Sequence, residues 1–538
     1  MNTIFYNGKI RTLDKAYPQV SAMAVRDGVI LRLGTDEEIL PLREEQTQLI
    51  DLRGRLMLPG FVDSHMHLLF YGTFRRRVDL VNTTTYAEAA ELCRKAAEKV
   101  RGTGSWVIAC NFNQINWSDT HKMPDRGDLD AVAADVPIFL QRACGHIVCM
   151  NTLGLRLAGL WEERADTTRE TMDFGADGLP NGYVRENTAM RALSCCERYT
   201  VEEMKDILEE ACLEAAAKGI VQVHSDDFNL IADDDFEEVL RAYRELSEEG
   251  RLHIRVNEQI RFRRTEQLQR FLDLGYHAND SIGHFKFGPV KFLCDGSLGS
   301  HSAAMRQPYR NDPETRGLLL FTDEELYELA KLAYTNGYHL AAHCIGDRAL
   351  EQMVNTIQRV SEEFPAVDRR NGIIHCQIMD EALQDRFREL NLVAYVQPIF
   401  LKADSAVVDD CVGAELGRQS YNWRRYADLG VHMCGGSDCP VEPFDILPNL
   451  YCAVTRRGKP DMEPWYPENG VTLEEAVKMF TSEAAYASYD ESRYGTLTVG
   501  KYADLVVLDR DIFARPPEEL FETQVDLTMV EGKIVYRR

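Results

Sequence analysis

The chain has 538 residues, of which 45% are hydrophobic, so it is long enough for two or three domains with a sizeable core. Acidic residues outnumber basic ones by 86 − 61 = 25, which argues against a nucleic-acid or anionic-membrane partner, and no apolar run has membrane-spanning length. The 14 cysteines contain no CxxC pair and the N-terminus has no basic-then-apolar leader, so we expect reduced thiols and a cytoplasmic location.

Both ends of the chain carry short strands separated by turns. Asn7-Gly8 and Asp27-Gly28 divide apolar runs near the N-terminus, and such dipeptides are hairpin signals. Glu531-Gly532 repeats the pattern near the C-terminus. We therefore predict that residues 1–55 and 495–538 meet as one small β-sandwich that flanks a larger domain.

Between these ends, over residues 56–494, apolar strands alternate with helical segments. The predicted strands are 56–62, 220–224, 252–256, 289–293, 339–343, 372–375, 392–396 and 431–434. This alternation predicts an α/β protein with a parallel (β/α)8 TIM-like barrel, and an open doubly wound sheet is the competing interpretation.

The stretch between the first two predicted strands is far too long for a crossover connection. Residues 73–200 contain helical, strand-like and glycine-rich pieces. We expect an inserted subdomain after the first barrel strand, on the C-terminal face of the barrel, where insertions commonly cover the substrate.

Polar residues with metal-binding chemistry follow several predicted strands. His65 and His67 end the first strand, and in an extended backbone residues i and i+2 point to the same face. The other strand-end residues of this kind are His224, Lys291, His343, His375 and Asp438. Any one of them is more often a core or surface residue, but together on the rim that carries chemistry in such barrels they indicate a metal centre.

The order of these residues resembles that of the binuclear amidohydrolases. The closer resemblance is to the YtcJ-like branch, which includes N-substituted formamide deformylases. Further matching stretches are residues 288–297, 343–347, 436–441 and 500–509, so the resemblance spans essentially the whole chain.

The resemblance implies a site for two divalent metal ions. His65, His67 and Asp438 would hold the more buried ion, and His343 and His375 the second. Lys291 would bridge both as an N-carboxylated lysine formed with CO2, because a plain ammonium would be repelled by two cations. Zinc is the first expectation, although this donor set also accepts manganese, iron or nickel.

The implied activity is metal-dependent hydrolysis of a C–N amide bond other than a peptide bond. The substrate would be a small molecule, an N-substituted formamide or another N-acyl compound. A hydroxide that bridges the metals would attack the carbonyl, and Asp438 would carry the proton to the leaving nitrogen. His224 either binds the carbonyl oxygen or oxyanion, or is structural.

Other residues are weaker candidates for substrate contacts. Asp295 and Gly296 directly follow the lysine strand and could line the pocket. Asn113, Trp117 and His146 lie in the insertion and are candidate lid residues, although each is more often structural.

Two other functions and one open question accompany this interpretation. In a one-metal hydrolase or deaminase, Lys291 would stay a cation and bind an acidic substrate. A non-catalytic scaffold on the same fold, as in the dihydropyrimidinase-related proteins, is the alternative from a different class. The sequence leaves the oligomeric state open, with a homodimer as the default expectation.

Overall fold

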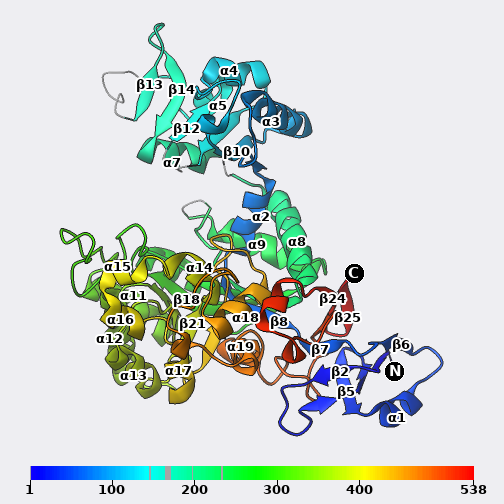
Figure 1. Ribbon diagram of the computed structural model, residues 1–538. Helices are drawn as coiled ribbons and strands as arrows, with labels where there is room; N and C mark the ends of the chain where they lie inside the picture. The colour runs from blue at the N-terminus through cyan, green and yellow to red at the C-terminus, as the bar shows by residue number, and fades with distance from the viewer. Residues whose placement is uncertain (1, 144–146, 164–170, 197, 232–233) are drawn as a thin grey trace. The chain divides into compact units, whose positions relative to one another are not determined.

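The computed structural model describes residues 2–143, 147–163, 171–196, 198–231 and 234–538 (Figure 1). The chain divides into two units. The first, called the barrel unit, comprises Met1–Leu69, Met204–Asn229 and Phe236–Arg538, and the second, called the inserted unit, comprises Phe70–Glu203 and Leu230–Asp235.

The centre of the barrel unit is a parallel sheet of eight strands that follow one another in chain order. They are β8 (Phe61–Met66), β15 (Ile220–Ser225), β16 (Arg255–Arg261), β18 (Phe285–Leu293), β19 (Leu340–Cys344), β20 (Gly372–His375), β21 (Val393–Val396) and β22 (Met433–Gly435). The segment after β22 returns to β8, where the Asp438 amide donates to the His65 carbonyl at 2.8 Å. The predicted TIM-like barrel is therefore confirmed as a nearly closed barrel of eight parallel strands.

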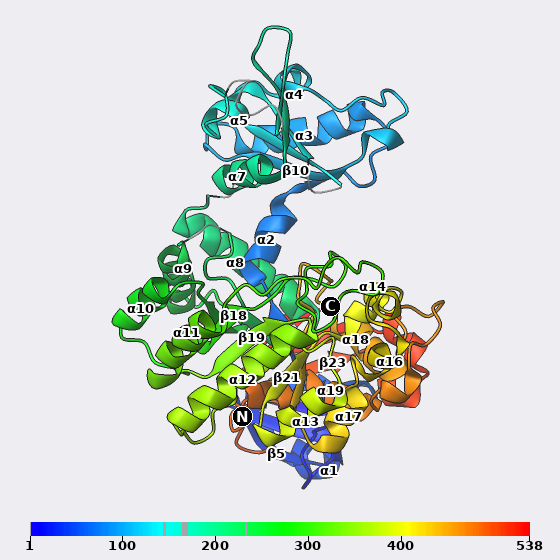
Figure 2. The ribbon, with the colours of Figure 1, turned by 90° about the vertical axis from the view of Figure 1, so that its left-hand side faces the viewer.

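Helices between the strands cover the outside of the barrel (Figure 2). They include α9 (Phe236–Glu248), α10 (Thr265–Asp273), α11 (Asp323–Thr335), α12 (Asp347–Glu363), α13 (Glu381–Glu389) and α17 (Trp423–Leu429). In α11 the Thr322 hydroxyl and the Glu325 carboxylate form a capping box at the N-terminus. Leu326, Leu329 and Ala333 are buried at helical spacing, which gives α11 one apolar face to pack inward.

The apolar run at 56–62, predicted as a single strand, is divided between two sheets. Leu56–Pro59 forms β7, which pairs with β2 and β23 of a terminal sheet, and the barrel strand β8 begins only at Phe61. The break falls at Gly60, where a Cβ atom would lie 2.2 Å from Val221 Cγ1. Both halves are buried, so hydrophobicity alone could not reveal the division.

The third and fourth barrel strands also differ from their predicted ranges. The third was predicted at 252–256, but β16 continues to Arg261. The fourth, β18, begins at Phe285 rather than at residue 289. The extension of β16 contains Asn257, Glu258 and Gln259, polar residues buried in the barrel, and they hid the strand from a search for apolar runs.

Two further sheets of the barrel unit are built from the chain ends, the first from N-terminal strands alone and the second from strands of both ends. One has the order β5-β4-β1-β6 and the other β25-β24-β23-β7-β2-β3. The strands are β1 (Thr3–Tyr6), β2 (Lys9–Arg11), β3 (Gln19–Val20), β4 (Ala22–Arg26), β5 (Val29–Gly34), β6 (Gln48–Asp51), β23 (Leu505–Leu508), β24 (Val525–Val530) and β25 (Lys533–Arg537). One hydrophobic cluster joins the sheets and includes Phe5, Met23, Met57, Val507 and Met529.

Two of the three predicted hairpin turns in these sheets are present, and the third is not. Asp27-Gly28 connects the antiparallel pair β4 and β5, and Glu531-Gly532 connects β24 and β25. The predicted hairpin at Asn7-Gly8 is wrong, because β1 and β2 belong to different sheets. There the chain passes from one sheet to the other, and Asn7 has a positive φ of 54°.

The inserted unit contains its own sheet, with the order β13-β14-β12-β11-β10-β9. Its elements are β9 (Val78–Asp79), β10 (Val107–Phe112), β11 (Ile138–Arg142), β12 (Ile147–Met150), β13 (Met172–Phe174), β14 (Pro180–Arg185), α3 (Tyr86–Val100), α4 (Arg126–Val132), α5 (Thr152–Leu157) and α7 (Glu186–Cys196). That this unit covers the substrate stays a prediction. Over the described residues, no helix combines the length and apolarity needed to cross a membrane.

Gly60 provides a test of how tightly the two sheets join. We expect Gly60→Ala to destabilise the protein by about 1–3 kcal/mol, since the new methyl group would overlap the Val221 side chain. Denaturant unfolding measures the change, and the double variant Gly60→Ala/Val221→Ala should recover part of it. Gly299→Ala is the control, because a Cβ there meets no atom within 4 Å. Equal stability of the Gly60 and Gly299 variants would contradict this account.

Candidate metal centre

Three potential ligands converge at the closure of the barrel. His65 and His67 come from the end of β8, and Asp438 comes from the segment after β22. The Asp438 Oδ1 atom lies 3.2 Å from His65 Nε2 and 3.1 Å from His67 Nε2. One ligand atom from each residue falls within 4.8 Å of the others, a spacing that fits a single divalent cation.

Hydrogen bonds at Nδ1 set the tautomers of these imidazoles. His65 Nδ1 donates to Gln259 Oε1 at 2.7 Å, and His67 Nδ1 donates to the Asp226 carbonyl at 2.9 Å. An acceptor at Nδ1 places the proton there and leaves the Nε2 lone pair free for a metal. Both rings are therefore arranged as ligands toward the same point near Asp438.

His343 and His375 continue this group from β19 and β20. The ring centroids of His343 and His375 are 4.4 Å apart, and His375 is 5.5 Å from His65. His375 Nδ1 donates to Gln397 Oε1 at 2.9 Å, which leaves its Nε2 free. His343 instead donates from Nε2 to the Gly296 carbonyl at 3.2 Å, so its free lone pair is on Nδ1. All four predicted histidine ligands thus lie in one continuous cluster.

Lys291 is buried beside this cluster. Its Nζ atom lies 3.3 Å from His65 Nε2 and donates to Asp226 Oδ2 at 2.6 Å. Burial lowers the pKa of the Lys291 ammonium from its ordinary value, although the Asp226 carboxylate opposes this shift. The structure therefore brings Lys291 to the centre, as predicted, but with a partner that the sequence analysis did not identify.

His224 is completely buried on β15. Neither ring nitrogen has a hydrogen-bond partner among the described residues, and the ring centroid lies 6.3 Å from that of Tyr395. Burial lowers the pKa of His224 to about 3, so the imidazole is neutral at ordinary pH and one N–H remains available as a donor. Its predicted contact with a substrate carbonyl stays a prediction.

The Asp295 carboxylate has a structural role. It accepts backbone N–H bonds from Ala304 at 2.9 Å, Ile345 at 3.1 Å and Gly346 at 2.8 Å. These bonds join the loops that follow β18 and β19. Both Asp295 and Gly296 also lie beside a predicted ligand, since His343 Nε2 is 3.2 Å from the Gly296 carbonyl oxygen and 3.4 Å from Asp295 Oδ1. Their roles in substrate binding stay predictions.

The candidates in the inserted unit have structural contacts within it. Trp117 is buried, stacks on Phe112 at 5.4 Å and donates from Nε1 to Thr83. The Asn113 side chain caps a short 3-10 helix by accepting from the Ile115 amide. Their roles in substrate binding stay predictions, and His146 lies outside the described residues.

The sequence analysis missed several residues that support the ligands. Gln259 and Gln397 hold the imidazoles of His65 and His375, and Asp63 accepts the amides of His65 at 3.2 Å and Ser437 at 3.0 Å. Asp226 contacts both Lys291 and His67. Gln397 directly follows a predicted strand and Asp226 lies two residues after the end of another, so a search that included every polar residue just after the strand ends would have found them.

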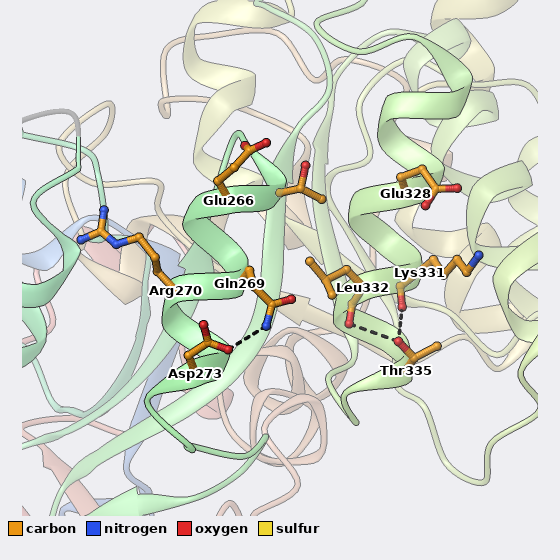
Figure 3. A pocket seen from close by; sticks show the side chains of 9 residues that line it. Glu266, Gln269, Arg270, Asp273, Glu328, Lys331, Leu332 and Thr335 are labelled. Atoms are coloured by element: carbon orange, nitrogen blue, oxygen red, sulfur yellow. Dashed lines mark hydrogen bonds between the residues drawn. The ribbon is translucent and has the colours of Figure 1, made fainter.

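An open depression of about 580 Å³ lies elsewhere on the barrel unit, between helices α10 and α11 (Figure 3). Its lining is mostly polar and comprises Thr265, Glu266, Gln269, Arg270, Asp273, Glu328, Lys331, Leu332 and Thr335. None of these residues is a predicted ligand, so this depression is not the candidate active site.

The glutamine contacts generate a prediction about metal affinity. We expect Gln259→Leu and Gln397→Leu each to weaken metal binding about 10–100-fold, since an imidazole without its Nδ1 acceptor is free to rotate and change tautomer. Competition with a chromophoric chelator measures the affinity. Gln384→Leu is the control, because Gln384 is also buried but bonds to Gln419 on the outside of the barrel. Unchanged affinity in both test variants would contradict the proposed support.

Comparisons with known proteins agree with this geometry. The model of the amidohydrolase family matches residues 48–536. The YtcJ protein of Bacillus subtilis is 30% identical over 100% of both chains, and N-substituted formamide deformylase of Arthrobacter pascens is 25% identical over 99% of this chain and 98% of its own. The solved structure of an uncharacterized metal-dependent hydrolase from Pyrococcus furiosus has a TM-score of 0.80 and 26% identity, and covers 96% of this chain and 99% of that one. The predicted resemblance to the YtcJ-like branch is confirmed, and this chain belongs to the amidohydrolase family.

Proposed function

We propose that this protein is a metal-dependent hydrolase that cleaves the C–N amide bond of a small N-acyl compound, such as an N-substituted formamide. The observation that carries the proposal is the convergence of His65 Nε2, His67 Nε2 and Asp438 Oδ1. The names of two relatives, a formamide deformylase and a metal-dependent hydrolase, support the reaction class.

The donor set fits two divalent ions, with zinc as the first candidate. His65, His67 and Asp438 would hold one ion, and His343 and His375 would hold the other. Lys291, carboxylated at Nζ, would bridge them. Bound ions would supply Lewis-acid polarisation of the carbonyl and would lower the pKa of a water molecule.

Asp438 is the group that we propose carries the proton, and it is ionised as a metal ligand must be. Burial alone would raise the pKa of Asp438, but its contacts with His65 and His67 outweigh burial and hold the pKa well below its ordinary value. The carboxylate is therefore ionised at neutral pH and can accept a proton at Oδ. Delivery of that proton to the nitrogen of the substrate is needed because an unprotonated amine is a poor leaving group.

His224 is the proposed group that binds the substrate carbonyl. It is neutral, and its N–H has no other partner among the described residues. A neutral N–H donor can stabilise charge that develops on a carbonyl oxygen.

A one-metal hydrolase or deaminase is the second candidate. In it, Lys291 would stay an ammonium and keep the 2.6 Å contact of its Nζ atom with Asp226 Oδ2. Without the bridging carbamate, only the ion held by His65, His67 and Asp438 would keep its set of three ligands.

Metal content distinguishes these candidates. Protein purified without chelator or a nickel column should contain about two divalent ions per chain, and Lys291→Ala should lose at least one of them. About one ion in the natural protein, unchanged by Lys291→Ala, would favour the one-metal candidate. A chain that binds neither zinc nor manganese would favour the alternative of a non-catalytic scaffold. Turnover of N-formyl and N-acyl amides then tests the reaction class.

Asp438→Asn tests the proton transfer. We expect turnover to fall by at least about 100-fold, because the carboxamide cannot accept the proton. The loss should be smaller for an N-acyl nitroaniline than for an N-acyl alkylamine, since a weakly basic leaving group needs less protonation. Steady-state kinetics of both substrates, with metal content measured in parallel, provide the comparison. An equal loss for both substrates would assign Asp438 a ligand role without proton transfer.

A further inference from the structure

Two buried polar atoms beside Lys291 form an ion pair but are too far apart for a hydrogen bond. Asp226 Oδ1 and Arg261 Nε are 3.6 Å apart, and neither has a hydrogen-bond partner in the described part of the chain. An ordinary N–H···O bond measures about 2.9 Å, so a shift of less than about 1 Å would join them. Buried atoms of this kind are rarely left unpaired, which indicates that the observed arrangement is one of two.

Asp226 is fixed to the metal centre on two sides. It directly follows β15, and its side chain is completely shielded from solvent. Its Oδ2 atom accepts from Lys291 Nζ at 2.6 Å, while its backbone carbonyl accepts from His67 Nδ1 at 2.9 Å. Of its two carboxylate oxygens, only Oδ1 is therefore unused.

Arg261 is held so that its Nε–H remains available. It is the last residue of β16 and lies in register with Lys291 on the adjacent strand. Its Nη2 atom donates to the Asn229 carbonyl at 2.8 Å, which anchors the guanidinium from one side. Both the arginine and Asp226 are buried, so water screens their interaction only weakly.

Carboxylation of Lys291 would change the charge that faces Asp226 from +1 to −1. In the reaction, the ammonium loses two protons to the solvent buffer and the Nζ lone pair forms a C–N bond with CO2, while one C–O π bond of CO2 opens to give the second carboxylate oxygen. Nothing is oxidised or reduced. In the proposed two-metal site the ions would neutralise the carbamate, but Asp226 would lose the Lys291 ammonium as its partner, and a buried carboxylate is costly without a cation or a donor beside it. Two other described groups lie within ion-pair distance of the Asp226 carboxylate, Arg261 Nε at 3.6 Å from Oδ1 and His67 Nδ1 at 3.9 Å from Oδ2. Because His67 Nδ1 already donates to the Asp226 backbone carbonyl, Arg261 is the group that could take over from Lys291.

We propose that Asp226 is a two-position switch that pairs with Lys291 while the lysine is an ammonium and with Arg261 once the lysine is carboxylated. This inference rests on the proposed carboxylation of Lys291. Asp226 and Arg261 act as positioning residues, because they determine which form of Lys291 the interior accepts. The metal content of the protein would therefore depend on a pair that binds no metal itself.

The first experiment removes the compensating cation. R261M has a side chain of similar length without charge, and we expect it to keep Lys291 as an ammonium on Asp226. Protein incubated with zinc and ¹³C-bicarbonate is examined by ¹³C NMR for the carbamate signal, and zinc per chain is measured. At limiting bicarbonate the carbamate signal should fall at least about 10-fold, with loss of about one zinc ion per chain.

The second experiment restores the balance by removing the anion as well. D226N/R261M leaves neither charge beside Lys291, so at least about half of the carbamate signal should return. A merely structural role of Arg261 predicts further loss instead. D227N is the matched control, since Asp227 is an adjacent buried carboxylate that bonds to Ser225 and Tyr243, and it should leave the carbamate signal unchanged.

The outcomes separate this inference from the proposed function. A wild-type carbamate level in R261M, or no recovery in the double variant, would overturn the switch. If R261M does not fold, R261K keeps the charge and should keep the signal, and loss of the signal would overturn the switch. Natural protein without a carbamate signal at saturating bicarbonate would also overturn it, although metal-dependent hydrolysis could still be observed. Protein with carbamate and zinc but no turnover of N-acyl amides would reject only the proposed function.

Discussion

The closure of the barrel between its first and last strands is the constraint on which the metal centre depends. Asp63 on β8 accepts the Ser437 amide and hydroxyl, and the Asp438 amide in turn donates to the His65 carbonyl. These bonds join segments more than 370 positions apart in sequence. They place Asp438 between two imidazoles that belong to the other end of the barrel. Loss of this closure would separate the three ligands even if every strand still formed.

The surrounding residues hold the ligands in place before any metal binds. The imidazoles of His65, His67 and His375 each have an acceptor at Nδ1, and the Nε2 atoms of His65 and His67 lie 3.2 Å and 3.1 Å from Asp438 Oδ1. The acceptors come from other barrel strands or from the residues that follow them, so the barrel itself sets the ring orientations. Such preorganisation reduces the conformational entropy that metal binding would otherwise have to overcome.

Charge balance in the interior is the second constraint. Asp226, Lys291 and Arg261 are all buried, and a buried charge is tolerated only with a partner of opposite sign. Their arrangement leaves one oxygen and one N–H unpaired, which gives the cluster a second stable pairing if the charge of Lys291 changes. The residues that bind metal and the residues that balance charge are therefore distinct, and substitutions in either group should affect metal content.

The sequence by itself determined the alternation of strands and helices and the chemistry at the strand ends. The alternation depends on local periodicity, and His65, His67 and Asp438 were identified because side chains that can bind metals stand together at the predicted strand ends. Tertiary structure decided the rest. The apolar run is divided at Gly60 between two sheets, and the sequence could not show this because both halves are buried and look alike. At Asn7-Gly8 the chain crosses from one sheet to another instead of forming a hairpin, because the local sequence does not specify which strands pair. Tertiary structure also gave Gln259, Asp226 and Arg261 their roles, since their partners belong to other strands of the barrel.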